Sequence, residues 1–353
     1  MKLGRTFNHV EDLVFFHGKQ GALEALEHLA EVSSNGYNSL RMKWDGSPQI
    51  YWGRDEKNGP LIIATHNAWS KNVKCCSGNE IKEFILSTGE FSDNRVNFAN
   101  KFSQLYSLFD NATPAEFVGF VYADALYLST PDAINGVFSF SPNPHSNTTF
   151  HVTENSTLGN AVAESDVMVV GHAYYSIFGQ NEDSQQPIDD FSMFLTNELI
   201  VLGPVYNQTP ITIEASDICR LQNIAETSDI DIFLERRKGL ADLKDIIYRY
   251  VNSSSKNKQL EMLSVLHFSN WVGTSNLTNS KKQNLLSLIS SHLTSVEIMF
   301  KLILEIMNIK NAIISQLKPT GEIWDTNSEG MVRYSNKPLG HVKFVPRHLW
   351  TPK

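Results

Sequence analysis

The stretch RMKWDGSPQIYWG, residues 41–53, places a single lysine, Lys43, between two large apolar residues and follows it with Asp45-Gly46. A lysine in this setting either reaches solvent from the end of a strand or is kept partly desolvated for a chemical purpose. Its amine attacks phosphorus only when neutral, which requires a pocket with apolar walls. A glycine at position 46 would allow close approach of the backbone. Taken alone, so short a pattern favours a strand end followed by an ordinary Asp-Gly turn.

The composition is that of an ordinary globular protein. The chain has 353 residues, of which 41% are hydrophobic and 10% aromatic, enough for one large core or two modest ones. A formal charge of -8 argues against a protein that coats nucleic acid through bulk charge, but it is compatible with a local basic groove.

Charged residues interrupt the N-terminal sequence where a signal peptide needs an apolar run, which predicts a cytoplasmic protein. The cysteines, Cys75, Cys76 and Cys219, offer no zinc motif and fit a reducing compartment.

Hydrophobic spacing divides the chain into predicted segments. Residues 1–37 predict a helical lead-in with an amphipathic helix behind two glycines. Residues 38–216 contain short apolar and aromatic runs broken by turn residues, and this strand pattern returns over 319–353. Residues 217–318 show helical spacing, with too many charges to cross a bilayer. The prediction is an α+β fold of mixed, largely antiparallel sheets, with a helical subdomain inserted between the two strand-rich segments.

Four further segments follow the lysine motif in a characteristic order. They are Asp124 in VYADALYL, the aromatic strand VVGHAYYSIFG, Glu329 in EGMV and Lys343 in HVKFV. In this order the chain resembles the covalent nucleotidyltransferase superfamily of ATP-dependent polynucleotide ligases and RNA-capping enzymes. Within it, the chain is similar to a phage-encoded group of RNA or DNA ligase-like proteins. The stretches NHVEDLVFFHGKQGALEALEHL, KWDGSP and FSFSPN carry that likeness.

The resemblance implies a ligase-type nucleotidyltransferase domain with a covalent site. Lys43 would be the catalytic nucleophile that takes AMP from ATP. The implied nucleotide-binding residues are Met42, Lys43, Asp45, Gly46, Lys71, Asp124, His172, Tyr174, Glu329 and Lys343. Asp124 and Glu329 would bind Mg²⁺ or Mn²⁺, and Lys343 would be a phosphate ligand. The implied reaction joins 5'-phosphate to 3'-hydroxyl ends of nucleic acid.

The chain also departs from the superfamily pattern. Pro48 stands where many ligases have an arginine that contacts the nucleotide. The aromatic residue that usually stacks on adenine would fall near Gly171-His172, which leaves His172 or Tyr174 as substitutes. A histidine, His341, takes the place of one of the two lysines usual in the last motif. Only ten residues follow Lys343, so we expect no C-terminal OB barrel and favour RNA over duplex DNA as the acceptor.

Three alternatives stay open: an ATP-dependent DNA ligase, a GTP-dependent capping guanylyltransferase and a non-catalytic nucleic-acid-binding relative. In the helical segment, Arg236-Arg237-Lys238 and Lys281-Lys282 are candidate phosphate contacts, although charge runs are more often solvated faces. We expect no membrane partner, and a location in the host cytoplasm if the protein is phage-encoded. The sequence does not determine the oligomeric state.

Overall fold

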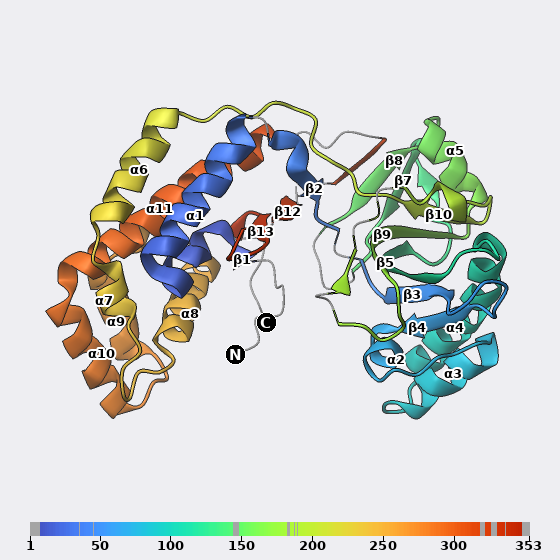
Figure 1. Ribbon diagram of the computed structural model, residues 1–353, viewed down its shortest axis with the longest axis horizontal. Coiled ribbons are helices and arrows are strands. Elements are labelled where there is room, and N and C mark those ends of the chain that lie inside the picture. Colours follow the sequence, from blue (N-terminus) through green and yellow to red (C-terminus); the bar gives the residue numbers. More distant parts are fainter. Residues whose placement is uncertain are drawn as a thin grey trace. The chain divides into compact units, whose positions relative to one another are not determined.

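The computed structural model describes residues 8–34, 36–44, 46–143, 148–181, 184–186, 188, 190–317, 322–325, 330–335 and 337–347. The chain forms two compact units, each assembled from segments that are distant in the sequence (Figure 1). The first unit comprises Met1–Arg5, Lys43–Val205 and Pro319–Ser328. The second comprises Thr6–Met42, Tyr206–Lys318 and Glu329–Lys353.

Two sheets form the framework of the first unit. The five-stranded sheet has the order β10-β9-β5-β3-β4, and only the β10–β9 pair in it is parallel. Its strands are β3 (Gln49–Arg54), β4 (Ile62–Thr65), β5 (Gly119–Tyr127), β9 (Val167–Tyr175) and β10 (Leu199–Leu202). The four-stranded sheet, of order β11-β8-β7-β6, is antiparallel. Its strands are β6 (Ala133–Ile134), β7 (Val137–Phe140), β8 (Phe150–Thr153) and β11 (Ile323–Asp325).

Two helices cover one face of the five-stranded sheet. These are α3 (Gly78–Ser87) and α4 (Asp93–Ala112), and their apolar side chains share one buried core with those of β3 and β5. Each begins at a serine whose hydroxyl accepts a hydrogen bond from the backbone three residues on, an ordinary N-cap. The strand-based prediction for residues 38–216 did not include them. Other helical pieces in the described part of this unit are α2 (His66–Ser70), α5 (Thr157–Glu164) and the 3₁₀ turn η4 (Ser192–Phe194).

The second unit packs a small sheet against a set of helices. The sheet has the order β1-β13-β12-β2, with β1 (Asn8–His9), β2 (Leu40–Met42), β12 (Met331–Arg333) and β13 (Val342–Phe344). The helices are α1 (Leu13–Ser34), α6 (Ala215–Thr227), α7 (Ile230–Leu234), α8 (Leu243–Lys256), α9 (Val265–Thr274), α10 (Asn279–Ser291) and α11 (Leu293–Gln316). Short 3₁₀ turns are η1 (Val10–Asp12), η2 (Tyr37–Ser39) and η5 (Leu260–Met262).

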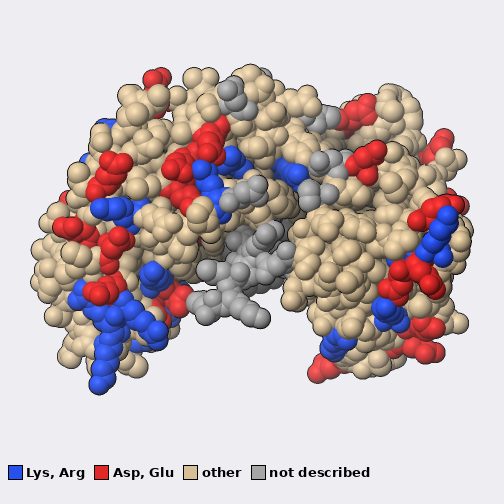
Figure 2. Space-filling model, in the orientation of Figure 1, with Lys and Arg blue, Asp and Glu red and all other residues tan. Residues whose placement is uncertain are grey.

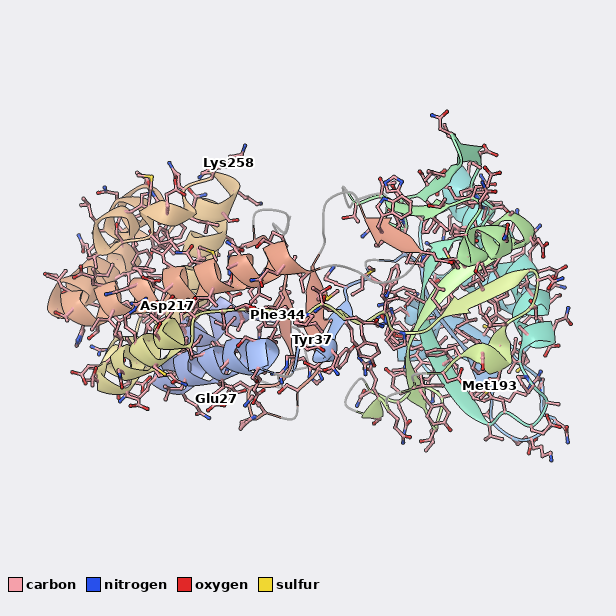
Figure 3. The ribbon with its side chains drawn as sticks, turned by 90° about the horizontal axis from the view of Figure 1, so that it is seen from above. Glu27, Tyr37, Met193, Asp217, Lys258 and Phe344 are labelled. Atoms are coloured by element: carbon pink, nitrogen blue, oxygen red, sulfur yellow. The ribbon has the colours of Figure 1, made fainter. Side chains whose placement is uncertain are left out.

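The helix α1 runs beside α6, as Glu27 and Asp217 mark in Figure 3. It bends at Gly18, where a φ of 64° breaks the helical geometry. The amphipathic helix predicted behind two glycines lies within α1, which begins before both of them, at Leu13. None of the helices in the described part of the chain combines the length and the apolar character needed to cross a membrane.

The α+β class with mostly antiparallel sheets is confirmed, and so are the helices between residues 217 and 318. The two compact units nevertheless divide the chain differently from the predicted domains 1–37, 38–216 with 319–353, and 217–318. The helices do not form an insert of their own. The apolar side chains of Leu40 and Phe344 lie in one buried core with α1, α8 and α11, so the small sheet and the helices fold together.

Candidate functional site

The backbone around Lys43 is held by two buried neighbours. Met42, the last residue of β2, is 5% exposed and pairs with Met331 of β12. Trp44 is 6% exposed, and its ring centroid lies 5.0 Å from that of Phe150 in β8. The Lys43 side chain between them is half-buried. The two large apolar residues of the quoted stretch are thus anchors, one in each unit, and Lys43 stands where the chain passes from the second unit to the first.

Gly46 brings the lysine motif against Asp124. A Cβ built on Gly46 would lie 2.6 Å from the Asp124 Cβ and 2.7 Å from the Ala125 carbonyl oxygen, closer than real Cβ atoms come. Two backbone hydrogen bonds fasten the same segment to β5: Ser47 N–H to the Ala125 carbonyl (3.1 Å) and Ala125 N–H to the Pro48 carbonyl (3.0 Å). Only glycine allows this approach at position 46. Asp45 itself lies outside the described residues.

Asp124 lies at the centre of a polar cluster on the five-stranded sheet. The Gln49 amide donates to the Tyr122 hydroxyl (2.8 Å), which donates to Asp124 Oδ1 (3.3 Å). The His172 Nε2 lies 3.1 Å from Asp124 Oδ2, although not with the angles of a hydrogen bond. Asp124 is only 7% exposed, so these neighbours hold its carboxylate in place. The structure therefore brings together Gly46, Asp124 and His172, three of the predicted residues.

Sequence reasoning missed Gln49 and Tyr122. Tyr122 could have been found from strand geometry, because it is two residues before Asp124 and side chains two apart share one face of a strand. Gln49 stands opposite Asp124 in the β3–β5 register. The register itself is not readable from the sequence, because either strand could be shifted along the other.

The two candidates for adenine stacking are placed differently. His172 lies in the Asp124 cluster, with its ring centroid 5.1 Å from that of Tyr122. Tyr174 instead donates its hydroxyl to the Val118 carbonyl (3.0 Å), just before β5 begins, so it does not join the cluster. The neighbouring Gly171 has a packing reason to be glycine, because a Cβ there would lie 2.3 Å from the buried ring of Phe191.

A pocket of about 390 Å³ opens beside the lysine motif. Its lining includes Ser47, Pro48 and Gln49 and also Arg95 of α4. The Arg95 side chain is held by hydrogen bonds from Nε to the Ile85 carbonyl (2.7 Å) and from Nη2 to the Thr88 hydroxyl (3.1 Å). Arg95 therefore lines the same pocket as Pro48, although position 48 itself lacks an arginine.

Lys71 is exposed directly after α2 and does not line this pocket.

Lys343 lies on β13, 6% exposed, opposite Val332 of β12 and His9 of β1. The strands of the Gly-Met-Val and HVKFV motifs are thus antiparallel neighbours, and β2 pairs with β12 on its other side. Lys343 belongs to the second unit, whereas Lys43 and Asp124 belong to the first. Glu329 lies outside the described residues.

The described residues do not assemble a metal site from protein ligands alone. Among them no group of three or more His, Cys, Asp or Glu side chains could hold a metal ion. Of the two predicted metal ligands, Asp124 already accepts from Tyr122 and faces His172, and Glu329 is not described.

A protein-family model matches residues 5–350, a range that runs through both units. The chain belongs to the family of unknown function DUF6267. No curated protein and no solved structure matches the chain. DUF6267 membership therefore assigns no reaction to the chain.

Proposed function

We propose that the chain is an ATP-dependent polynucleotide ligase that works through AMP bound covalently to Lys43, with RNA as the favoured acceptor. One observation carries the proposal most: the glycine of the KWDG motif packs directly on Asp124, the residue that the resemblance assigns to the same nucleotide site. A structural lysine followed by a solvent turn has no need of this contact. The order of the motifs along the chain supports the same conclusion.

The first step is nucleophilic attack by Lys43 on the α-phosphorus of ATP. The amine must first lose its proton. A P–N bond then forms and the nitrogen releases a second proton, while the bond from the α-phosphorus to the bridging oxygen breaks and pyrophosphate leaves with the electron pair. Asp124, held by Tyr122 and His172, would orient the nucleotide beside the lysine. The role of Lys343 as a phosphate ligand stays a prediction from the resemblance.

The second and third steps rest on the resemblance alone. An oxygen of a 5'-phosphate end attacks the phosphorus of the lysyl-AMP, the P–N bond breaks, and the lysine nitrogen regains a proton. A 3'-hydroxyl then attacks the 5'-phosphorus, AMP leaves, and the hydroxyl proton is released. The product is a continuous phosphodiester strand.

The test is the formation of the covalent adenylate. Purified protein is incubated with ATP and either Mg²⁺ or Mn²⁺, and its intact mass is measured. We expect a mass increase of one AMP in the wild type and none in Lys43→Met. Lys43→Arg should also stay unmodified, because a guanidinium remains protonated and cannot attack. Persistence of the adduct in Lys43→Met would assign the nucleophile elsewhere.

The same assay separates the alternatives. Labelling from GTP but not from ATP would identify a capping-type guanylyltransferase. Absence of any adduct with both nucleotides and both metals would favour the non-catalytic nucleic-acid-binding relative. The choice between RNA and DNA needs an end-joining assay that compares the two kinds of acceptor.

A further inference from the structure

We propose that the loop before α8 and the helix α10 form one basic surface that binds the phosphate backbone of a single-stranded polynucleotide. The surface, here called the α10 strip, comprises residues 235–245, which end in the first turn of α8, and the helix α10. The identity of the partner rests on the proposed function, whereas the surface itself is argued from charge and packing. It lies wholly within the second unit.

The α10 strip has an excess of positive charge in a chain whose net charge is -8. Its basic residues are Arg236, Arg237, Lys238, Lys244, Lys281 and Lys282, and its acidic residues are Glu235, Asp242 and Asp245. Figure 2 shows Lys and Arg side chains gathered over the α10 end of the second unit. Because backbone binding to nucleic acid depends on such local concentration of cations, the overall negative charge does not oppose it.

Two contacts and one close approach join the loop to α10 along its length. Arg237 Nη2 lies 3.4 Å from His292 Nε2 at the C-terminal end of the helix. A Cβ on Gly239 would lie 3.2 Å from the Asn284 amide nitrogen in the middle. Lys281 makes a 2.8 Å ion pair with Asp242 at the N-terminal end.

The contacts run in order along the helix, so the loop follows α10 over a length of about 16 Å at the usual rise per residue. The two basic clusters, which are distant in the sequence, therefore belong to one surface. A strip of this length offers room for several consecutive phosphates of an extended strand.

Arg236, Lys238 and Lys282 are available to a ligand, whereas Lys281 is paired with Asp242 and Lys244 donates to the Phe16 carbonyl. Arg236 and Lys238 are exposed, and neither makes a hydrogen bond or ion pair with any other residue that the structure describes. Lys282 donates to the Gly273 carbonyl (2.8 Å), a neutral partner that leaves its charge uncompensated. Of the acidic residues, Asp242 is neutralised by Lys281. Arginine and lysine heads presented in this way are the usual ligands of phosphodiester oxygens.

The experiment measures binding of fluorescein-labelled single-stranded RNA and DNA by fluorescence anisotropy over a series of salt concentrations. The strip variant is Arg236→Glu/Lys238→Glu. The matched control is Lys256→Glu/Lys258→Glu, which makes the same change in net charge on exposed residues of the same unit (Figure 3 labels Lys258). These lysines lie at and beyond the far end of α8, about 20 Å from the loop along the helix. Circular dichroism and Tm establish that both variants are folded.

We expect the strip variant to bind at least about tenfold more weakly than the wild type, with the slope of log Kd against log salt reduced by about two, while the control binds like the wild type. Equal binding by the strip variant and the control would overturn the inference. So would the absence of polynucleotide binding by the wild type.

Self-adenylylation of the wild type, measured separately, tests the proposed function. Strip-dependent RNA binding without an adenylate would leave this inference standing and refute the ligase. An adenylate together with strip-independent binding would support the proposed function and refute the inference about the α10 strip.

Discussion

Arg333 donates a hydrogen bond to His28, with 2.5 Å between the Arg333 Nη1 and the His28 Nδ1. A guanidinium has no acceptor and stays charged, so the Nδ1 must carry the lone pair and the ring is neutral. His28 is fully buried on α1. Burial, followed by the charge of Arg333, lowers the pKa of His28 to about 3. The link therefore joins α1 to β12 only while the histidine is unprotonated.

This relationship predicts a loss of stability in mild acid. The folded pKa of about 3 lies below the unfolded value of about 6.5, so the unfolded chain binds the extra proton first. Stability is complete above the unfolded pKa and is lost as pH falls from about 6.5 towards 3. Between about pH 7 and about pH 5 the His28 contribution should lower the free energy of unfolding by about 2 kcal/mol. Urea denaturation at the two pH values measures this change in the free energy of unfolding.

The matched variant is His28→Gln, whose amide oxygen can still accept from Arg333 but does not titrate. Its free energy of unfolding should change by about 2 kcal/mol less than that of the wild type over the same pH interval. An identical pH dependence in the two proteins would show that other groups cause the acid sensitivity.

A second prediction concerns a buried ionic network in the second unit. Lys310 and Arg347 lie 2.7 Å and 3.1 Å from the same Glu11 oxygen, and all three side chains are almost fully buried. Burial raises the pKa of Glu11, but Lys310 and Arg347 outweigh it and the net direction is downward. Lys310→Met should lower the free energy of unfolding by about 3 to 5 kcal/mol, because it leaves a buried carboxylate undercompensated.

The control is the exposed pair of Lys74 and Asp55, whose charged atoms are 2.6 Å apart. Both side chains are about two-fifths exposed, so Lys74→Met should change stability by less than about 1 kcal/mol. Comparable losses from the two methionine substitutions would mean that the buried network contributes no more than a surface pair.

A third prediction follows from the glycine of the KWDG motif. Gly46→Ala forces a methyl group against the Ala125 carbonyl, so it should cost about 1 to 3 kcal/mol and impair self-adenylylation. Gly273 on α9 has nothing within 4 Å of the position that a Cβ would take, so Gly273→Ala should instead stabilise the fold by about 0.5 to 1 kcal/mol. Thermal unfolding of both variants provides the comparison, and a neutral Gly46→Ala would show that β5 can move away.

A fourth prediction is the choice of acceptor. End joining is measured with 5'-phosphorylated substrates, nicked or single-stranded, that carry ribonucleotides or deoxyribonucleotides on the 3'-hydroxyl side. We expect faster joining with ribonucleotides at the junction, because 2'-hydroxyl groups add contacts that DNA lacks. Efficient sealing of an all-DNA nick, without any gain from ribonucleotides, would make the protein a DNA ligase.

Much of the local structure could be predicted from spacing. The apolar positions of α8, α10 and α11 recur at three and four residues, and this period is set by the helix itself. The helix α4 was missed because residues 38–216 were interpreted as strands throughout, although Ser92 stands at its start as an N-cap. The lysine motif was also visible, since its residues are contiguous.

The sequence by itself determined the α+β class, the mostly antiparallel strands, the helices after residue 217 and the position of the KWDG motif. Only the tertiary structure decided that β12 and β13 join β2 and the helices, that Asp124 contacts Gly46, and that two basic clusters share one surface. The spacing of apolar residues indicates which face of a helix or strand is apolar, and this is a local property of the sequence. The partner of that face, and the register between strands, depend on packing among residues far apart in the chain, where many pairings satisfy the same pattern.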